Sequence, residues 1–111
     1  MKKYKKVYVF DIDGTICTLT DGDYAKSEPI QSRIDTVNRL YAENNKIVFQ
    51  TARGMGRTQN NSELAIKMFH DFTYNQLKSW GVNFHELFLG KPAGDIYVDD
   101  KSFNDRDFFT D

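Results

Sequence analysis

The order of apolar segments along the chain restricts the fold more than any other feature of the sequence. Four short runs are rich in β-branched and aromatic residues and are expected to be strands: residues 4–10, 46–51, 84–90 and 95–100. Longer stretches with helical spacing separate the first three runs. Such alternation is typical of a parallel sheet. We therefore predict an α/β fold with a three-layer, Rossmann-like sheet, built from one domain over residues 1–111.

The two predicted helices have recognisable ends. The first is expected to begin near Pro29, which suits a first helical turn, and to end at Asn44. The second is expected to extend from Ser62 to Trp80, and Gly81 follows it as a C-terminal stop. The helices therefore fill the two connections between the first three strands.

Two polar features modify this outline. Thr73 and Gln76 have the spacing of a capping box, so two shorter helices are an alternative to one long helix. The polar stretch 15–26 contains the dipeptide Asp21-Gly22, which is a signal for a hairpin turn. We expect a small β-hairpin flap at this place.

The composition argues against several functional classes. A net charge of -1 gives no general reason to expect binding to nucleic acid. No apolar run approaches the roughly 18 residues that a membrane span requires, so no membrane partner is expected. The single cysteine, Cys17, excludes an intramolecular disulfide and fits a reducing compartment. We therefore expect a cytoplasmic protein.

Polar residues stand where each predicted strand ends. They are Asp11 and Asp13 after the first strand, Thr51 and Arg53 at the second, Lys91 after the third, and Asp99 and Asp100 at the fourth. Open parallel sheets bind their ligands beyond the carboxyl ends of the strands. We therefore expect these side chains to meet at one site.

Four carboxylates at one site need a positive partner. Two unit charges about 4 Å apart repel by about 4 kcal/mol at an effective dielectric of about 20, so the aspartates cannot all stay ionised alone. Clustered carboxylate oxygens suit a hard divalent cation, and Mg²⁺ with retained waters is the usual choice. Because Mg²⁺ bridges carboxylate and phosphoryl oxygens, the pattern predicts a phosphorylated substrate.

The spacing of Asp11 and Asp13 suits phosphoryl transfer. One carboxylate can attack phosphorus and form an aspartyl-phosphate, which water then hydrolyses in a second step. The other can protonate the leaving oxygen and later activate that water. Both can act on one phosphate only if the chain leaves its extended path after Asp11, and Gly14 gives it that freedom.

Four segments of the sequence resemble the four motifs of the haloacid dehalogenase-like (HAD) phosphohydrolases. They are "FDIDGTI" (residues 10–16), "VFQTARG" (48–54), "GKP" (90–92) and "YVDD" (97–100), in the order that the family has. The resemblance implies about four parallel strands in the order 4-1-2-3. Only a hairpin's length of chain stands at the first position where the family inserts a cap domain. A capless member with an open site is therefore expected.

The resemblance also implies a role for each motif residue. Asp11 is similar to the family's nucleophile, which also binds the metal. Asp13 corresponds to the general acid and base, and its backbone carbonyl to a second metal ligand. Thr51 matches the hydroxyl residue that hydrogen-bonds the transferring phosphoryl group. Lys91 matches the cation that holds nucleophile and phosphate together.

The remaining motif positions are expected to complete the metal and substrate contacts. Of the acidic pair in the fourth motif, Asp100 resembles the direct Mg²⁺ ligand and Asp99 a residue of the outer shell, although the two roles could be exchanged. The residues expected to contact the substrate are Gly14, Ala52, Arg53 and Gly54.

The expected function is that of a Mg²⁺-dependent phosphomonoester hydrolase acting on a small sugar phosphate or a related metabolite. The finer pattern, which includes "TICTLTDGDYAKSEP" and "QLKSWGV", resembles small phosphatase-like proteins associated with capsule and surface-sugar biosynthesis. An open site also admits a macromolecular substrate such as a polynucleotide end. The absence of a basic stripe counts against nucleic acid.

A regulatory domain is the alternative from another class. A receiver-like or non-catalytic phosphate-binding domain would use similar residues, but in a receiver domain the acidic pair follows the first strand and the phosphorylated aspartate follows the third.

Only eleven residues follow Asp100, so a fifth strand is doubtful and one edge of the sheet is expected to be exposed. A homo-oligomer could cover that edge.

Overall fold

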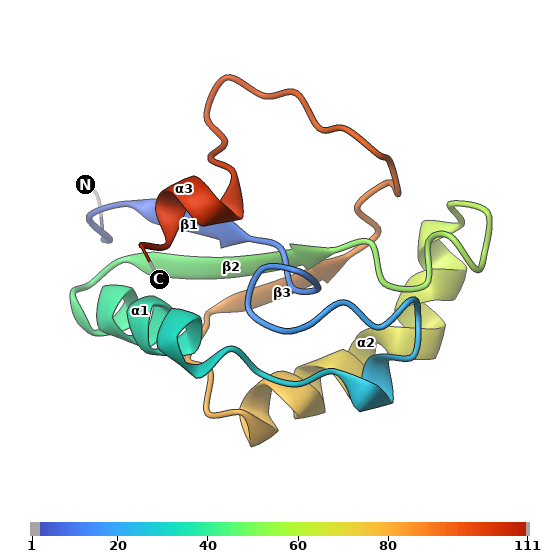
Figure 1. The fold of residues 1–111 in the computed structure, drawn as a ribbon, viewed down its shortest axis with the longest axis horizontal. Coiled ribbons are helices and arrows are strands. Elements are labelled where there is room, and N and C mark those ends of the chain that lie inside the picture. The colour runs from blue at the N-terminus through green and yellow to red at the C-terminus, as the bar shows by residue number, and fades with distance from the viewer. Residues whose placement is uncertain (1–2, 111) are drawn as a thin grey trace.

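The computed structural model describes residues 3–110 and contains one parallel sheet with helices beside it (Figure 1). The strands are β1 (Val7–Phe10), β2 (Lys46–Thr51) and β3 (Glu86–Leu89), in the spatial order β1-β2-β3. The helices are α1 (Gln31–Ala42), α2 (Ser62–Ser79) and α3 (Asp105–Phe108), and a short 3₁₀ helix, η1, covers Tyr24–Lys26. The predicted α/β class with a parallel sheet is therefore right.

The two long helices start and stop where local chemistry allows. The side chain of Asn61 caps α2 by accepting a hydrogen bond from the Leu64 N–H at 3.1 Å. Beyond α2, Gly81 has φ +73, which glycine adopts without strain. Asn44 takes the same left-handed conformation after α1, with φ 69. Because α2 is continuous, the chain does not adopt the alternative of two shorter helices.

One face of the sheet forms the core. The side chains buried there against α1 and α2 are Phe10 from β1, and Ile47 and Phe49 from β2. Both helices lie on the same side of the sheet, as Figure 1 shows. The apolar stripe of α1 is buried against this face because its members, Ile34, Val37 and Leu40, recur at helical spacing.

The other face of the sheet carries no long helix. Val7 and Val9 of β1 are 60% and 56% exposed, and Phe88 of β3 is 55% exposed. The predicted third layer is therefore wrong. A second layer of helices is missing on this face because the only helix described after β3 is α3, and its four residues are too few to cover the sheet.

The predicted fourth strand is also wrong, and with it the order 4-1-2-3. Residues 95–100 lie in the long connection between β3 and α3, which arches away from the sheet (Figure 1). The hydroxyl of Tyr97 donates to the Pro92 carbonyl at 2.7 Å and accepts from the Gly94 N–H at 2.9 Å. Asp99 accepts from the Lys101 N–H in the same local way, at 2.9 Å. Such local bonds compete with a strand ladder.

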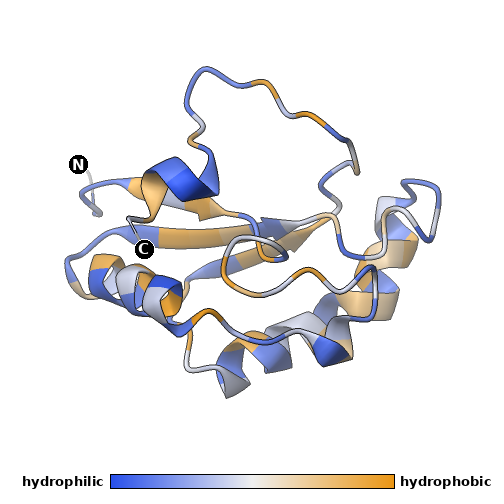
Figure 2. Ribbon diagram, in the orientation of Figure 1, coloured by the Kyte–Doolittle hydropathy of each residue, from blue (hydrophilic) through white to orange (hydrophobic). Residues whose placement is uncertain are grey.

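In this conformation, apolar side chains of the connection are exposed to solvent. Ile96 is 83% exposed and Val98 is 94% exposed. Figure 2 shows hydrophobic residues recurring along this arch. The alternating sequence of this segment therefore has strand character without a strand partner.

The flap is less regular than the predicted hairpin. The turn at Asp21 and Gly22 is present, with positive φ at both residues (57 and 91). An isolated antiparallel bridge between Cys17 and Pro29 closes the loop, but no ladder follows it. The helix η1 occupies the returning arm, where a second hairpin strand was expected.

Among the residues that the structure describes, no helix has both the length and the apolar character needed to cross a membrane.

Candidate active site at the carboxyl ends of the strands

The parallel sheet brings the ends of all three strands to one edge. A cleft of about 330 Å³ opens there, which lies within the range of small-molecule sites. Its lining includes Asp11, Asp13, Thr51, Ala52 and Arg53, together with flap residues. Five of the predicted site residues are therefore neighbours.

Asp11 follows β1 and is paired with Lys91, which follows β3. The Lys91 Nζ atom lies 3.7 Å from Asp11 Oδ2, and the two side chains are 16% and 37% exposed. The other carboxylate oxygen of Asp11 accepts the Ile12 backbone N–H at 2.8 Å. Burial raises the pKa of Asp11, while the Lys91 charge acts in the opposite direction. The pair places an anionic oxygen beside a cation, as a phosphoryl-transfer site needs.

The ring of Tyr97 also touches the lysine. Lys91 Nζ lies 4.1 Å from the centroid of that ring. The Lys91 backbone N–H donates to the Thr51 carbonyl at 3.2 Å, which ties the third strand's exit to the end of β2. These contacts hold the lysine beside Asp11, which lines the cleft.

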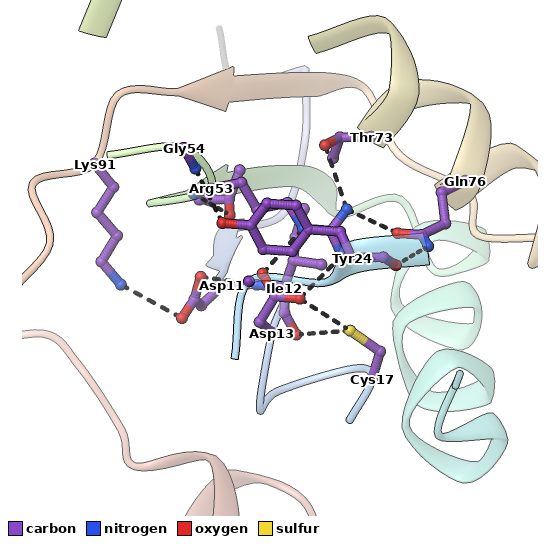
Figure 3. A network of polar contacts seen from close by, with 12 residues as sticks. Asp11, Ile12, Asp13, Cys17, Tyr24, Arg53, Gly54, Thr73, Gln76 and Lys91 are labelled. Carbon is purple, nitrogen blue, oxygen red and sulfur yellow. Dashed lines mark hydrogen bonds and ion pairs between the residues drawn. The ribbon is translucent and has the colours of Figure 1, made fainter. Parts of the chain in front are cut away.

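Asp13 makes a two-pronged ion pair with Arg53 (Figure 3). Arg53 Nε donates to Oδ2 of Asp13 and Nη2 donates to Oδ1, each at 2.9 Å. The Arg53 side chain is 0% exposed and that of Asp13 is 19% exposed. Arg53, expected from the sequence to contact substrate, thus directs its guanidinium at protein partners.

Thr51, Gly14 and Ala52 lie beside this pair. The Thr51 side chain is buried and its hydroxyl accepts the Arg53 backbone N–H at 3.1 Å. Gly14 has φ +78, so the chain does turn after the two aspartates in a conformation that glycine favours. Ala52 is partly exposed to the cleft.

Gly54 is positioned by the flap. Its N–H donates to the Tyr24 hydroxyl at 3.0 Å, and its φ is +79. A Cβ atom at this position would lie only 2.6 Å from Cδ2 of Phe69, whose ring packs edge-on against Tyr24 with centroids 5.2 Å apart. The contact leaves no room for any other residue without movement of Phe69.

We predict that Gly54→Ala destabilises the fold by about 2–4 kcal/mol, because left-handed strain and overpacking act together. A urea unfolding curve measures the loss. Gly56→Ala is the matched control, since a Cβ atom there meets nothing within 4 Å, and its unfolding midpoint is expected to stay or to rise slightly. Equal midpoints for the two variants would contradict the packing described for Gly54.

Asp99 and Asp100 are not part of the cleft. Both are exposed and belong to the arch between β3 and α3. The hydrogen bond from the Lys101 backbone N–H lowers the pKa of Asp99. Within residues 3–110, no three side chains of His, Cys, Asp or Glu come together as a metal site. The predicted convergence of four carboxylates is not formed.

The remaining donors fit Mg²⁺ in a more limited way. Such an ion usually keeps several waters and is bound by one or two carboxylates plus a substrate phosphate. The half-buried carboxylate of Asp11 suits that role, whereas both oxygens of Asp13 are engaged by Arg53. The resemblance to the HAD phosphohydrolases implies the Asp13 backbone carbonyl as a second ligand.

Two residues with a structural part in the site were not identified as such from the sequence. Thr73 and Gln76 of α2 accept hydrogen bonds from Arg53 Nη1 at 3.3 and 2.7 Å. Their spacing was interpreted as a capping box, but their common feature is a polar pair on the inner side of a helix, next to buried Leu77. A polar pair at that place signals a buried charge that needs partners.

Cys17 lies under the site as a packed, unreactive residue. Its side chain is fully buried and its Sγ atom is 3.6 Å from both the Ile12 carbonyl and Asp13 Oδ1. Burial raises the pKa of the thiol to about 12. The thiol is therefore protonated at neutral pH and does not serve as a nucleophile.

Comparison with known proteins supports the fold. No family model and no curated protein matches the sequence. Among solved structures, the chain is similar to the crystal structure of an MCSG target from Vibrio cholerae, with a TM-score of 0.83 and 25% sequence identity. The match covers 93% of this chain and 86% of the other. That name states no activity, so a function must be argued from the site.

Proposed function

We propose that this protein is a HAD-like phosphomonoester hydrolase that works through an aspartyl-phosphate on Asp11. The observation that carries the proposal is the contact of Lys91 with Asp11, a residue that lines the cleft together with Asp13. A nucleophile, a fixed cation and a second carboxylate are the parts that this chemistry needs. The motif resemblance supplies the same three residues independently of their position in space.

The reaction uses two displacements at phosphorus. In the first, an Asp11 carboxylate oxygen bonds to phosphorus and the ester P–O bond breaks, while the leaving oxygen takes a proton from Asp13. Asp13 is in its protonated form before this step and is left as the carboxylate that Arg53 pairs with. In the second, a water oxygen bonds to phosphorus, Asp13 takes the proton of that water, and the P–O bond to Asp11 breaks. Inorganic phosphate leaves and both aspartates return to their initial state.

Lys91 and Thr51 stabilise the phosphoryl group. Lys91 supplies positive charge next to the attacking oxygen. Thr51 lies at the end of β2, and its hydroxyl can donate a hydrogen bond to the phosphoryl group. Mg²⁺, when bound, neutralises charge on the phosphoryl oxygens. The residues that would hold it are Asp11, through its carboxylate, and Asp13, through its backbone carbonyl.

A small phosphorylated metabolite is the substrate class that the cleft suits. The cleft volume of about 330 Å³ is near the lower end for ligand sites, which fits a sugar phosphate better than a large group.

We also propose a cytoplasmic location, supported by the single buried thiol. The uncovered apolar face of the sheet supports a homo-oligomer, because parallel sheets are normally covered on both faces.

Phosphate release from a substrate panel tests the proposal. The panel consists of sugar phosphates, nucleotides, a phosphorylated oligonucleotide and p-nitrophenyl phosphate, each with Mg²⁺ and with EDTA. We expect Mg²⁺-dependent turnover with a preference for a sugar phosphate. Preference for the oligonucleotide would replace the substrate class but keep the reaction. Absence of turnover on every member by the folded protein would refute a stand-alone phosphatase and favour a phosphate-binding domain.

A further inference from the structure

Arg53 is the most extensively bonded side chain of the site, although it has no role in the chemistry above. Its guanidinium donates to both oxygens of Asp13 and, through Nη1, to Thr73 and Gln76. The ring of Tyr24 lies over the same group, with its centroid 4.6 Å from Cζ. Figure 3 shows these partners around one guanidinium.

The network joins three separate parts of the chain. Gln76 accepts from Arg53 through Oε1 and donates through Nε2 to the Tyr24 carbonyl at 2.8 Å. The Tyr24 hydroxyl in turn accepts the Gly54 N–H at 3.0 Å. Through Arg53, the loop after β1 is therefore connected to α2 and to the returning arm of the flap.

Stability alone does not explain such a buried pair. Replacing a buried ion pair by apolar side chains of similar volume is often neutral or stabilising, because the charges lose their hydration. What an arginine adds is geometry, since its planar fork fixes both oxygens of a carboxylate at once. Here the fixed carboxylate is Asp13, the group that must reach the leaving oxygen.

We propose that Arg53 is a positioning residue that orients the Asp13 carboxylate for proton transfer. The inference rests on the proposed phosphatase function and adds a residue to it. Arg53 acts through Asp13 and does not touch substrate. The contacts with Gln76 and Tyr24 keep the guanidinium in place, so the flap and α2 support the same orientation.

Substrates with different leaving groups separate this role from a merely structural one. A sugar phosphate loses an alkoxide, which needs a proton from Asp13, whereas p-nitrophenyl phosphate loses a stable anion that does not. We expect Arg53→Lys to lower kcat for the sugar phosphate at least about tenfold more than kcat for the aryl phosphate, as partial loss of general acid catalysis requires. Lysine keeps the charge but cannot form the fork.

Arg33→Lys is the matched control. Arg33 is 8% exposed and its Nη1 donates to Asp105 at 2.7 Å, so the same substitution disturbs another buried ion pair. The ratio of the two kcat values is expected to stay unchanged in this variant. Asp13→Asn is expected to show the selective loss in full, and adding Arg53→Lys to it is expected to change nothing further.

The outcomes distinguish the two levels of the proposal. Wild-type protein that hydrolyses neither substrate overturns the phosphatase function and the role of Arg53 with it. An active wild type with equal losses on both substrates in Arg53→Lys overturns the positioning role alone. If Arg53→Lys does not fold, Arg53→Gln serves instead, because it also removes the fork that holds both oxygens of Asp13. An unchanged kcat ratio in that folded variant also overturns the positioning role.

Discussion

Asp11→Asn is expected to lower kcat for every phosphomonoester by about 10⁴-fold or more, because loss of a nucleophile removes the covalent route altogether. The fold should be retained, since an amide oxygen can still accept the Ile12 N–H that Asp11 now accepts at 2.8 Å. Phosphate release in the presence of Mg²⁺ measures the loss. An acid-quenched reaction with labelled substrate should trap a phosphoenzyme in the wild type and none in the variant.

Asp35→Asn is the matched control for this experiment. Asp35 is an exposed residue of α1, and its carboxylate accepts a hydrogen bond from the Gln31 side-chain amide at 2.8 Å. The activity of the Asp35→Asn variant is expected to equal that of the wild type. If Asp11→Asn kept more than about a tenth of the wild-type kcat, Asp11 would not be the nucleophile, and the two-step reaction would have to be abandoned.

Phe49→Ala is expected to destabilise the protein by about 3–5 kcal/mol. Phe49 is fully buried in the central strand, and its ring centroid lies 5.9 Å from that of Phe10 and 5.8 Å from that of Phe84. Removing the ring leaves a cavity between the sheet and the helices that the surrounding side chains cannot fill. Small domains are stable by only about 5–15 kcal/mol, so the variant should be close to unfolded.

The same substitution at Phe88 gives the contrast. Phe88 lies on the neighbouring strand, but its side chain is 55% exposed on the uncovered face of the sheet. We expect Phe88→Ala to lose less than about 1 kcal/mol in urea unfolding. Similar losses for the two variants would mean that the uncovered face is buried in solution, and a concentration-dependent midpoint would then identify an oligomer as the cause.

The sequence was informative wherever short-range rules apply. The strand at residues 46–51 was predicted with the bounds that β2 has, since its apolar run is bracketed by polar ends. The turn at Gly14 followed from the need to bring two aspartates to one phosphate, and its φ of +78 shows that turn. Parallel strands then brought Asp11, Thr51 and Lys91 to one edge, as the strand-end rule predicted.

The same rules were wrong for residues 95–100. Alternation of apolar and polar residues states which segments are able to form a strand, but a strand also needs an edge to pair with and hydrogen bonds that favour it over local turns. In this segment, Tyr97 and Asp99 bond to their own neighbours instead. Without that strand, Asp99 and Asp100 are left outside the cleft.

Residue types and their spacing by themselves determined the α/β class, the three parallel strands and the carboxylates at the strand ends, because these depend on periodicity and on the direction of neighbouring strands. Only the tertiary structure decided the partners of those carboxylates. Asp11 is paired with Lys91, and Asp13 is held by Arg53 from forty positions along the chain. A buried charge takes its partners from whatever the fold brings within hydrogen-bond distance, and no local pattern encodes that distance.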